Sequence, residues 1–172
     1  DTLGKSTSQY TLVSYFNGTK TTSKPLKVWD KPYISIPLDK PADGTAPNGK
    51  EYTYTPNDCA VADINGDGEY EILLKWDPSN SHDNSQDGHT GNVYLDCYKL
   101  HYGNTSQFTG KPLWRIDLGP NIRAGAHYTQ FLFYDLNGDG KAELICKTAP
   151  GSKDGKKIRS EERRVGKECR SR

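Results

Sequence analysis

The sequence predicts an all-β fold, and two observations lead to that prediction. An acidic nine-residue loop occurs twice, at residues 63–71 and 135–143, and both copies read Asp-x-Asn-Gly-Asp-Gly-x-x-Glu. A short run of apolar and β-favouring residues follows each copy, at residues 72–76 and 144–148, and neither run has the period of an amphipathic helix. Each loop is therefore expected to join two strands.

A hairpin is the first element expected in chain order. Residues 10–16 and 19–29 favour strands, and the Asn-Gly pair at residues 17–18 is typical of a type I′ turn. A lone hairpin is at best marginally stable. Residues 1–30 are therefore interpreted as the last strands of an immunoglobulin- or fibronectin-like β-sandwich, and the Pro- and Gly-rich stretch from residue 31 leads into the repeats.

The repeat region is expected to consist of four-stranded units. The two acidic loops start 72 residues apart, at Asp63 and Asp135, and further strand candidates lie between them at residues 92–98 and 112–118. With one strand on each side of a loop, each repeat has four strands. Four antiparallel strands form one blade of a β-propeller, so the sequence predicts an incomplete propeller within residues 31–157.

The acidic loop has the composition of a calcium site, because alternating Asp, Asn and Asp side chains bring hard oxygen ligands to one point. An EF-hand or a dockerin-like pair would need an acidic ligand at loop position twelve, which is Leu74 in one copy and Cys146 in the other. A solvated turn without metal is the other alternative, and the repetition of the same acidic positions disfavours it. The predicted ligands of the first loop are the side chains of Asp63, Asn65, Asp67 and Glu71 and the backbone carbonyl of Glu69. Those of the second loop are the side chains of Asp135, Asn137, Asp139 and Glu143 and the backbone carbonyl of Lys141.

The C-terminal segment differs in composition from the rest of the chain. From Arg159 it resembles an in-frame translation of a common sequencing adapter, so residues 158–172 are set apart from the fold; the alternative is a native basic tail. Without its six basic and three acidic residues, the 172-residue chain keeps 17 basic and 19 acidic residues, and the net charge changes from +1 to −2. No nucleic-acid partner is expected from that charge, and no apolar stretch is long enough to predict a membrane span.

Four further segments connect the chain to a known family. They read YTYTPND at residues 52–58, LKWDPSN at 74–80, LWRIDLG at 113–119 and NIRAGAHYTQ at 121–130. With these segments and the acidic loops, residues from about Trp29 to Lys156 resemble the rhamnogalacturonan lyases of polysaccharide lyase family 11. The resemblance implies a secreted enzyme with an eight-bladed β-propeller, monomeric at full length, which cleaves the rhamnogalacturonan I backbone of pectin by calcium-assisted β-elimination at galacturonate.

The resemblance also implies which residues take part in the reaction. This chain is expected to supply the first one to two blades, so the catalytic base and acid are expected beyond its C-terminal end and the fragment is expected to be inactive. Asn57 and Asp77 are candidates for a second, substrate-facing calcium site. The alternative is that Asn57 caps a turn and Asp77 opens an Asp-Pro loop.

Arg123 and His127 are candidates for binding a uronate or a hydroxyl group of the polysaccharide, and the alternative is that both are hydrogen-bonded residues between blades. The polar loop at residues 79–90 has no strand signal and either overhangs a sugar-binding cleft or is an ordinary solvated loop. A different class of function also remains open. A non-catalytic calcium-binding propeller of the integrin type, which binds a protein or a glycan, would carry the same acidic loops.

Overall fold

The computed structural model describes residues 8–28, 33–101 and 108–155, and these contain strands and turns but no helix. The all-β class predicted from the sequence is therefore confirmed. None of the described residues belongs to a helix long and apolar enough to cross a membrane. The described residues form two compact units: the first contains 8–28, 33–37, 101 and 108–109, and the second contains 38–100 and 110–155. The segment set apart at residues 158–172 lies outside the described residues.

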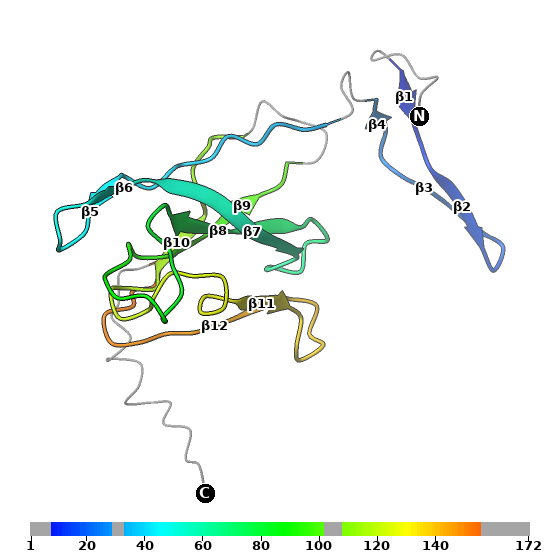
Figure 1. The fold of residues 1–172 in the computed structure, drawn as a ribbon. Coiled ribbons are helices and arrows are strands. Elements are labelled where there is room, and N and C mark those ends of the chain that lie inside the picture. The colour runs from blue at the N-terminus through cyan, green and yellow to red at the C-terminus, as the bar shows by residue number, and fades with distance from the viewer. Residues whose placement is uncertain (1–7, 29–32, 102–107, 156–172) are drawn as a thin grey trace, which may run out of the picture. The chain divides into compact units, whose positions relative to one another are not determined.

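The first unit consists of two short antiparallel pairs (Figure 1). β1 pairs with β4 and β2 pairs with β3; their bounds are β1 (Gln9–Tyr10), β2 (Val13–Phe16), β3 (Thr19–Thr22) and β4 (Leu26–Lys27). Asn17 and Gly18 connect β2 to β3 with φ of 46° and 76°. Two positive φ values in a two-residue loop are the signature of the type I′ turn, so the predicted hairpin is confirmed. The sandwich to which the hairpin was assigned stays a prediction.

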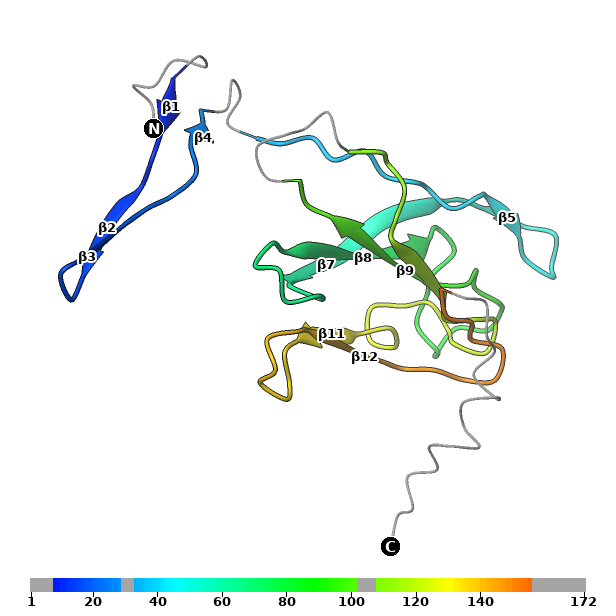
Figure 2. The ribbon, with the colours of Figure 1, turned by 180° about the vertical axis from the view of Figure 1, so that it is seen from behind.

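The second unit contains a four-stranded antiparallel sheet and two smaller hairpins (Figures 1 and 2). The sheet has the order β10-β9-β8-β7, so neighbours in sequence are neighbours in space. The bounds in this unit are β5 (Gly44–Thr45), β6 (Glu51–Tyr52), β7 (Tyr54–Ala62), β8 (Glu71–Pro78), β9 (Tyr94–Lys99), β10 (Trp114–Asp117), β11 (Phe131–Tyr134) and β12 (Glu143–Cys146). The first acidic loop joins β7 to β8 and the second joins β11 to β12, as the sequence predicts.

The sheet buries both of its faces, and β8 shows this most clearly. Leu73 packs on one face in a cluster with Leu95, Cys97 and Phe133, to which the β11–β12 hairpin contributes. Trp76 packs on the other face in a cluster with the residues Tyr54, Leu74 and Tyr98. Since successive side chains of a strand point to opposite faces, a strand that is buried on both sides reads as the near-continuous apolar run seen after the first loop.

The register between β7 and β8 shifts between Pro56 and Cys59. Such a β-bulge leaves residues out of the ladder and bends the strand locally. Here the two residues left out are Asn57 and Asp58. Both side chains are exposed. Lys75 lies opposite the bulge on β8, and Asp77 pairs with Thr55 just before it.

Candidate functional site

Hydrogen bonds within the first acidic loop fold it around its own side chains. The Asp63 carboxylate accepts the backbone N–H groups of Gly66 and Gly68, both at 2.7 Å. Asn65 Oδ1 accepts the N–H of Asp67 at 2.8 Å. Gly66 and Gly68 have φ of 78° and 82°, a region that glycine adopts without strain. The two glycines of the motif are therefore required by the backbone that wraps the loop.

The second acidic loop repeats this conformation. The Asp135 carboxylate accepts the N–H groups of Gly138 at 2.7 Å and Gly140 at 2.8 Å, and Asn137 Oδ1 accepts the N–H of Asp139 at 2.8 Å. The terminal glutamates also correspond. Glu71 Oε2 accepts the N–H of Ile64 at 3.1 Å and Glu143 Oε2 accepts the N–H of Leu136 at 2.9 Å. The sequence repeat is thus a repeat of backbone structure.

The pKa values of two carboxyls of the first loop, Asp63 and Asp67, are lowered. Burial opposes ionisation of Asp63, yet the N–H groups of Gly68 and Gly66 keep the pKa of this carboxyl below its ordinary value. The pKa of Asp67 is lowered by the N–H of Glu69 and by the ammonium of Lys99. Anionic oxygens are what a divalent cation needs, because protonated carboxyls do not bind it.

One oxygen of the first loop has no hydrogen-bond partner. Glu71 is wholly buried, and its Oε1 accepts no hydrogen bond. An unpaired charged oxygen in the interior is costly unless a cation or donor satisfies it. Lys99 Nζ lies 3.1 Å from Asp67 Oδ2, 3.6 Å from Glu69 Oε2 and 4.0 Å from Glu71 Oε1, so a positive charge already lies beside these carboxylates.

The donor set of both loops fits calcium, since carboxylate, amide and carbonyl oxygens are the ligands this cation takes. The oxygens are not fully converged, however. Among the described residues, no three His, Cys, Asp or Glu side chains are already gathered closely enough to hold a metal ion. In the second loop the Asn137 amide donates to Glu143 Oε1 at 2.9 Å and takes up the oxygen that is unpaired in the first. Calcium binding would therefore require small side-chain rotations.

The second pair of candidate residues lies on adjacent strands, with Asn57 in the bulge of β7 and Asp77 in the regular ladder of β8. Asn57 is exposed, whereas Asp77 is only 7% exposed and its Oδ1 has no hydrogen-bond partner. Burial raises the pKa of Asp77, against the opposing effect of the Lys75 ammonium. Lys75 Nζ itself lies 2.5 Å from Asp58 Oδ2. Neither Lys75 nor Asp58 was predicted as part of this site, because their contact depends on the bulge.

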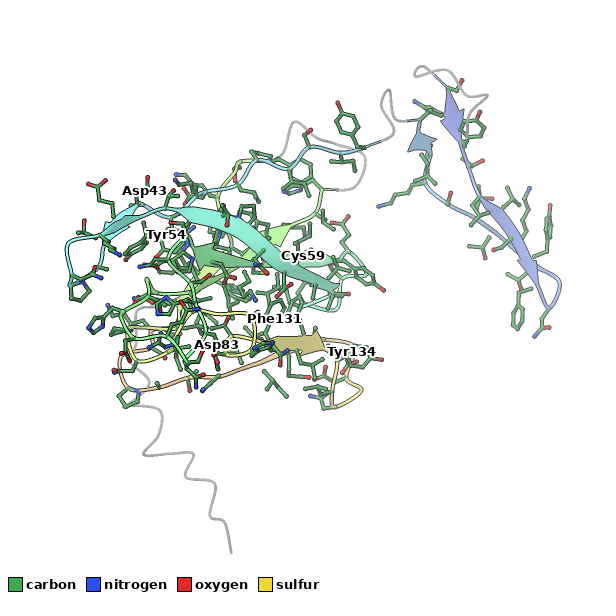
Figure 3. The ribbon with its side chains drawn as sticks, in the orientation of Figure 1. Asp43, Tyr54, Cys59, Asp83, Phe131 and Tyr134 are labelled. Carbon is green, nitrogen blue, oxygen red and sulfur yellow. The ribbon has the colours of Figure 1, made fainter. Side chains whose placement is uncertain are left out.

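Arg123 and His127 have different surroundings. Arg123 Nη1 contacts His82 Nε2 at 2.6 Å and donates to the Gln86 carbonyl at 3.2 Å, and Nη2 donates to the Gly88 carbonyl at 3.0 Å. Arg123 therefore holds the loop at residues 79–90. The His127 side chain is 77% exposed and its Nδ1 lies 3.7 Å from Asp83 Oδ2. Asp83 belongs to the same loop at residues 79–90 and is labelled in Figure 3.

A buried polar network on the other face of the sheet was not predicted. The Asp96 carboxylate is wholly buried and accepts hydrogen bonds from Trp76 Nε1 at 2.8 Å, from the Tyr98 hydroxyl at 2.9 Å and from Arg115 Nε at 2.7 Å. Arg115 also donates to the carbonyl of Asp39. No local motif marks these residues, because they come from three different strands and the segment before β5.

Comparison with known proteins identifies the family. The model of the "Rhamnogalacturonan lyase family 11, C-terminal domain" matches residues 33–164, more than half of the chain. The chain belongs to rhamnogalacturonan lyase family 11. The resemblance seen in the sequence is thereby confirmed. The family match extends past Arg159, where the adapter-like segment was expected to begin.

Two Bacillus subtilis (strain 168) members of rhamnogalacturonan lyase family 11 are similar to this chain. It is 58% identical over 156 residues to the rhamnogalacturonan endolyase YesW, and this alignment covers 90% of this chain and 24% of YesW. It is 59% identical over 134 residues to the rhamnogalacturonan exolyase YesX, and this alignment covers 78% of this chain and 21% of YesX. The chain therefore spans about a quarter of the length of these relatives.

Solved structures of family 11 lyases have the same fold over this region. The crystal structure of YesW superposes with a TM-score of 0.81 at 56% identity, over 92% of this chain and 26% of that chain. A Bacillus licheniformis rhamnogalacturonan lyase of the same family superposes with a TM-score of 0.81 at 53% identity, over 92% and 26%.

Proposed function

We propose that this chain is part of a secreted polysaccharide lyase that cleaves the rhamnogalacturonan I backbone of pectin by calcium-assisted β-elimination at galacturonate. The observation that carries the proposal is the family match over residues 33–164. The similarity to both an endolyase and an exolyase supports the substrate class and leaves the cleavage pattern open.

Elimination begins with removal of the proton at C5 of galacturonate. The neighbouring carboxylate opposes this step, because its negative charge disfavours the carbanion-like charge that develops. Calcium on that carboxylate would neutralise it and stabilise the developing charge. A base must take the C5 proton and an acid must protonate the O4 leaving group. We assign neither role to a described residue and expect the chain by itself to show no turnover.

Asn57 and Asp77 are proposed as this chain's contribution to the substrate-facing calcium. The exposed amide of Asn57 stands in the bulge, and the unpartnered Oδ1 of Asp77 is a ready ligand on the neighbouring strand. A metal that binds substrate must keep positions free for it, so two ligands from this chain leave room for the sugar carboxylate.

The two acidic loops are proposed as structural calcium sites. Each loop would use its ligands on one ion and would hold the turn between two strands, which agrees with the unpaired oxygen of Glu71. Extracellular calcium modules commonly bind at roughly 10⁻⁴ to 10⁻³ M, and affinities of this order are suited to a secreted protein.

We further propose that β7 to β10 form one blade of an eight-bladed propeller and that β11 and β12 begin the next. Two features support this assignment: the four strands follow one another in chain order, and both faces of the sheet are covered by apolar clusters. In a propeller each blade packs its faces on its neighbours, which is how the architecture limits exposed edges.

The decisive test uses the full-length protein of which this chain is part. It should release products with unsaturated uronate absorbance from rhamnogalacturonan I, and a chelator should abolish the signal until calcium is restored. Absence of any such product with calcium present would refute the lyase assignment. Glycan binding without product would instead favour a non-catalytic propeller.

A further inference from the structure

A polar cavity of about 320 Å³ opens between the turn of the β5–β6 hairpin and the loop at residues 79–90. This volume lies at the small end of the range for ligand pockets in proteins. Apart from Gly88, every lining residue has a polar side chain, among them Asn48, Lys50, Asn80, Gln86, Asp87 and His89. None of the acidic calcium loops contributes to it, and neither Asn57 nor Asp77 lines it.

Hydrogen bonds fix the wall that the hairpin turn provides. Ala46 N–H donates to the Lys50 carbonyl and Gly49 N–H donates to the Ala46 carbonyl, both at 2.8 Å. Asn48 Oδ1 accepts the N–H of Lys50 at 3.1 Å. The backbone that carries Lys50 is therefore held on both sides of the turn.

The opposite wall is held from behind by residues that do not line the cavity. Arg123 donates to the carbonyls of Gln86 and Gly88 and contacts His82 Nε2. The Tyr128 hydroxyl is 2.6 Å from Asn84 Oδ1 and accepts the N–H of Asn84 at 3.2 Å. A loop without strands is thus fixed before any ligand binds, which lowers the entropic cost of recognition.

Asn48, Asn80 and His82 use their side chains in hydrogen bonds within the protein, and four other lining side chains do not. The Lys50 ammonium, the Gln86 amide, the Asp87 carboxylate and the His89 ring form no hydrogen bond or ion pair with the part of the chain that the structure describes. This set offers one cation, one anion and several neutral donors and acceptors. No large apolar side chain lines the cavity, so an apolar ligand would gain little there, whereas a hydroxyl-rich ligand would find partners on both walls.

The cavity also lies at the end of the sheet where Asp77 lies. The loop starts at Ser79, directly after β8, and Ser79 N–H donates to the Thr53 carbonyl at 2.7 Å, next to the start of β7. Asp77 is two residues before Ser79. A polymeric ligand that reaches Asp77 at this end of the sheet would therefore extend toward the loop and the hairpin turn.

We propose that this cavity is a subsite for an acidic sugar residue of the polysaccharide, with the Lys50 ammonium paired to the uronate carboxylate and Gln86, Asp87 and His89 bonded to hydroxyl groups. The proposal rests on the proposed lyase function and deepens it, because it adds a binding position separate from the calcium ligands. An ion pair supported by hydrogen bonds gives the site a preference for charged over neutral sugar.

The test measures binding of a defined rhamnogalacturonan I hexasaccharide to the whole 172-residue chain by isothermal titration in calcium buffer. Lys50→Gln should weaken binding by about fivefold, a typical loss for one exposed charge-assisted contact. Lys20→Gln, on the exposed hairpin of the first unit, is the matched control and should change nothing. A carboxyl-reduced hexasaccharide should bind the parent chain and Lys50→Gln equally.

A second variant tests the loop at residues 79–90, which forms one wall of the cavity, rather than the contact between Lys50 and the uronate. Arg123→Gln should weaken binding of both oligosaccharides, because it releases the loop without removing the uronate partner. Equal affinities of Lys50→Gln and Lys20→Gln for the acidic hexasaccharide would overturn the subsite, and so would absence of binding by the folded parent chain. Either result would leave the proposed lyase function standing if the full-length protein still releases unsaturated products. If the full-length protein releases no such product but the chain still binds the oligosaccharide as expected, the proposed reaction is refuted and the proposed subsite is not.

Discussion

Lys75 and Asp58 form an ion pair between a buried and an exposed residue. Lys75 Nζ lies 2.5 Å from Asp58 Oδ2, although the Lys75 side chain is 1% exposed and that of Asp58 is 64% exposed. The bulge between Pro56 and Cys59 makes this contact possible, because it takes Asp58 out of the regular ladder opposite β8. The bulge therefore has an electrostatic role in addition to its effect on strand shape.

The first prediction concerns the asymmetry of this pair. Asp58→Asn should destabilise the chain by about 2 kcal/mol, because it removes the carboxylate that is paired with the buried ammonium of Lys75. Lys75→Met should cost less, since it removes the buried charge and keeps most of the volume. Urea unfolding of both variants and of the double variant checks this, and the double variant should match Lys75→Met. A greater loss in Lys75→Met than in Asp58→Asn would contradict it.

The second prediction concerns pH and Asp77. Burial raises the pKa of this carboxyl above its ordinary 3.8, so the folded chain binds the proton more tightly than the unfolded chain. Stability from this group therefore increases as pH falls through the raised pKa, and the gain is complete below 3.8. In chelator, Asp77→Asn should remove this part of the pH dependence and stabilise the chain at pH 7 relative to the parent. If the free energies of unfolding of the two proteins differ by the same amount at every pH from 7 to 4, the prediction is wrong.

The sequence predicted the parts of the structure that depend on neighbouring residues. The Asn-Gly pair predicted a type I′ turn because both residues tolerate positive φ. The acidic loops predicted strand connections because the runs that follow them favour strands and lack a helical period. The strands at 92–98 and 112–118 were also placed nearly where β9 and β10 lie.

The contacts that the sequence did not predict join residues far apart in the chain. Arg123 contacts His82 across 41 positions, and Arg115 and Asp96 pair across 19. The first contact depends on how two loops pack together and the second on the register between β9 and β10, and neither leaves a local pattern in one sequence. A guanidinium such as that of Arg123 is suited to binding a uronate, yet in the folded structure it donates to carbonyls of its own chain.

The third prediction concerns the two acidic loops. If each binds calcium, a concentration 100-fold above the dissociation constant should add about 2.7 kcal/mol per site to the free energy of unfolding. Glu71→Gln should remove the contribution of the first loop and Glu143→Gln that of the second. Glu69→Gln is the matched control, since its proposed ligand is the backbone carbonyl. Calorimetric melts with calcium and with chelator check this. An unchanged calcium effect in both Glu71→Gln and Glu143→Gln would exclude these loops as the binding sites.

The last prediction separates the two loops by Lys99, whose ammonium lies beside the carboxylates of the first loop. Lys99 Nζ lies within 4.0 Å of carboxylate oxygens of Asp67, Glu69 and Glu71, and its hydrogen bond to Asp67 raises the pKa of the ammonium, so it stays charged. This tethered cation repels calcium while it stabilises the loop in the absence of metal.

Lys99→Met should therefore act in opposite directions with and without the ion. In chelator it should lower stability, because the carboxylates then repel one another. In calcium it should raise the affinity of the first loop by about tenfold at low salt, and by less at high salt where charges are screened. Lys50→Met, in the turn between β5 and β6, is the control and should leave the first loop unchanged. Site-resolved NMR titration of the Gly66 and Gly138 amides distinguishes the loops, and an unaltered first-loop affinity in Lys99→Met would show that the lysine does not compete with the metal.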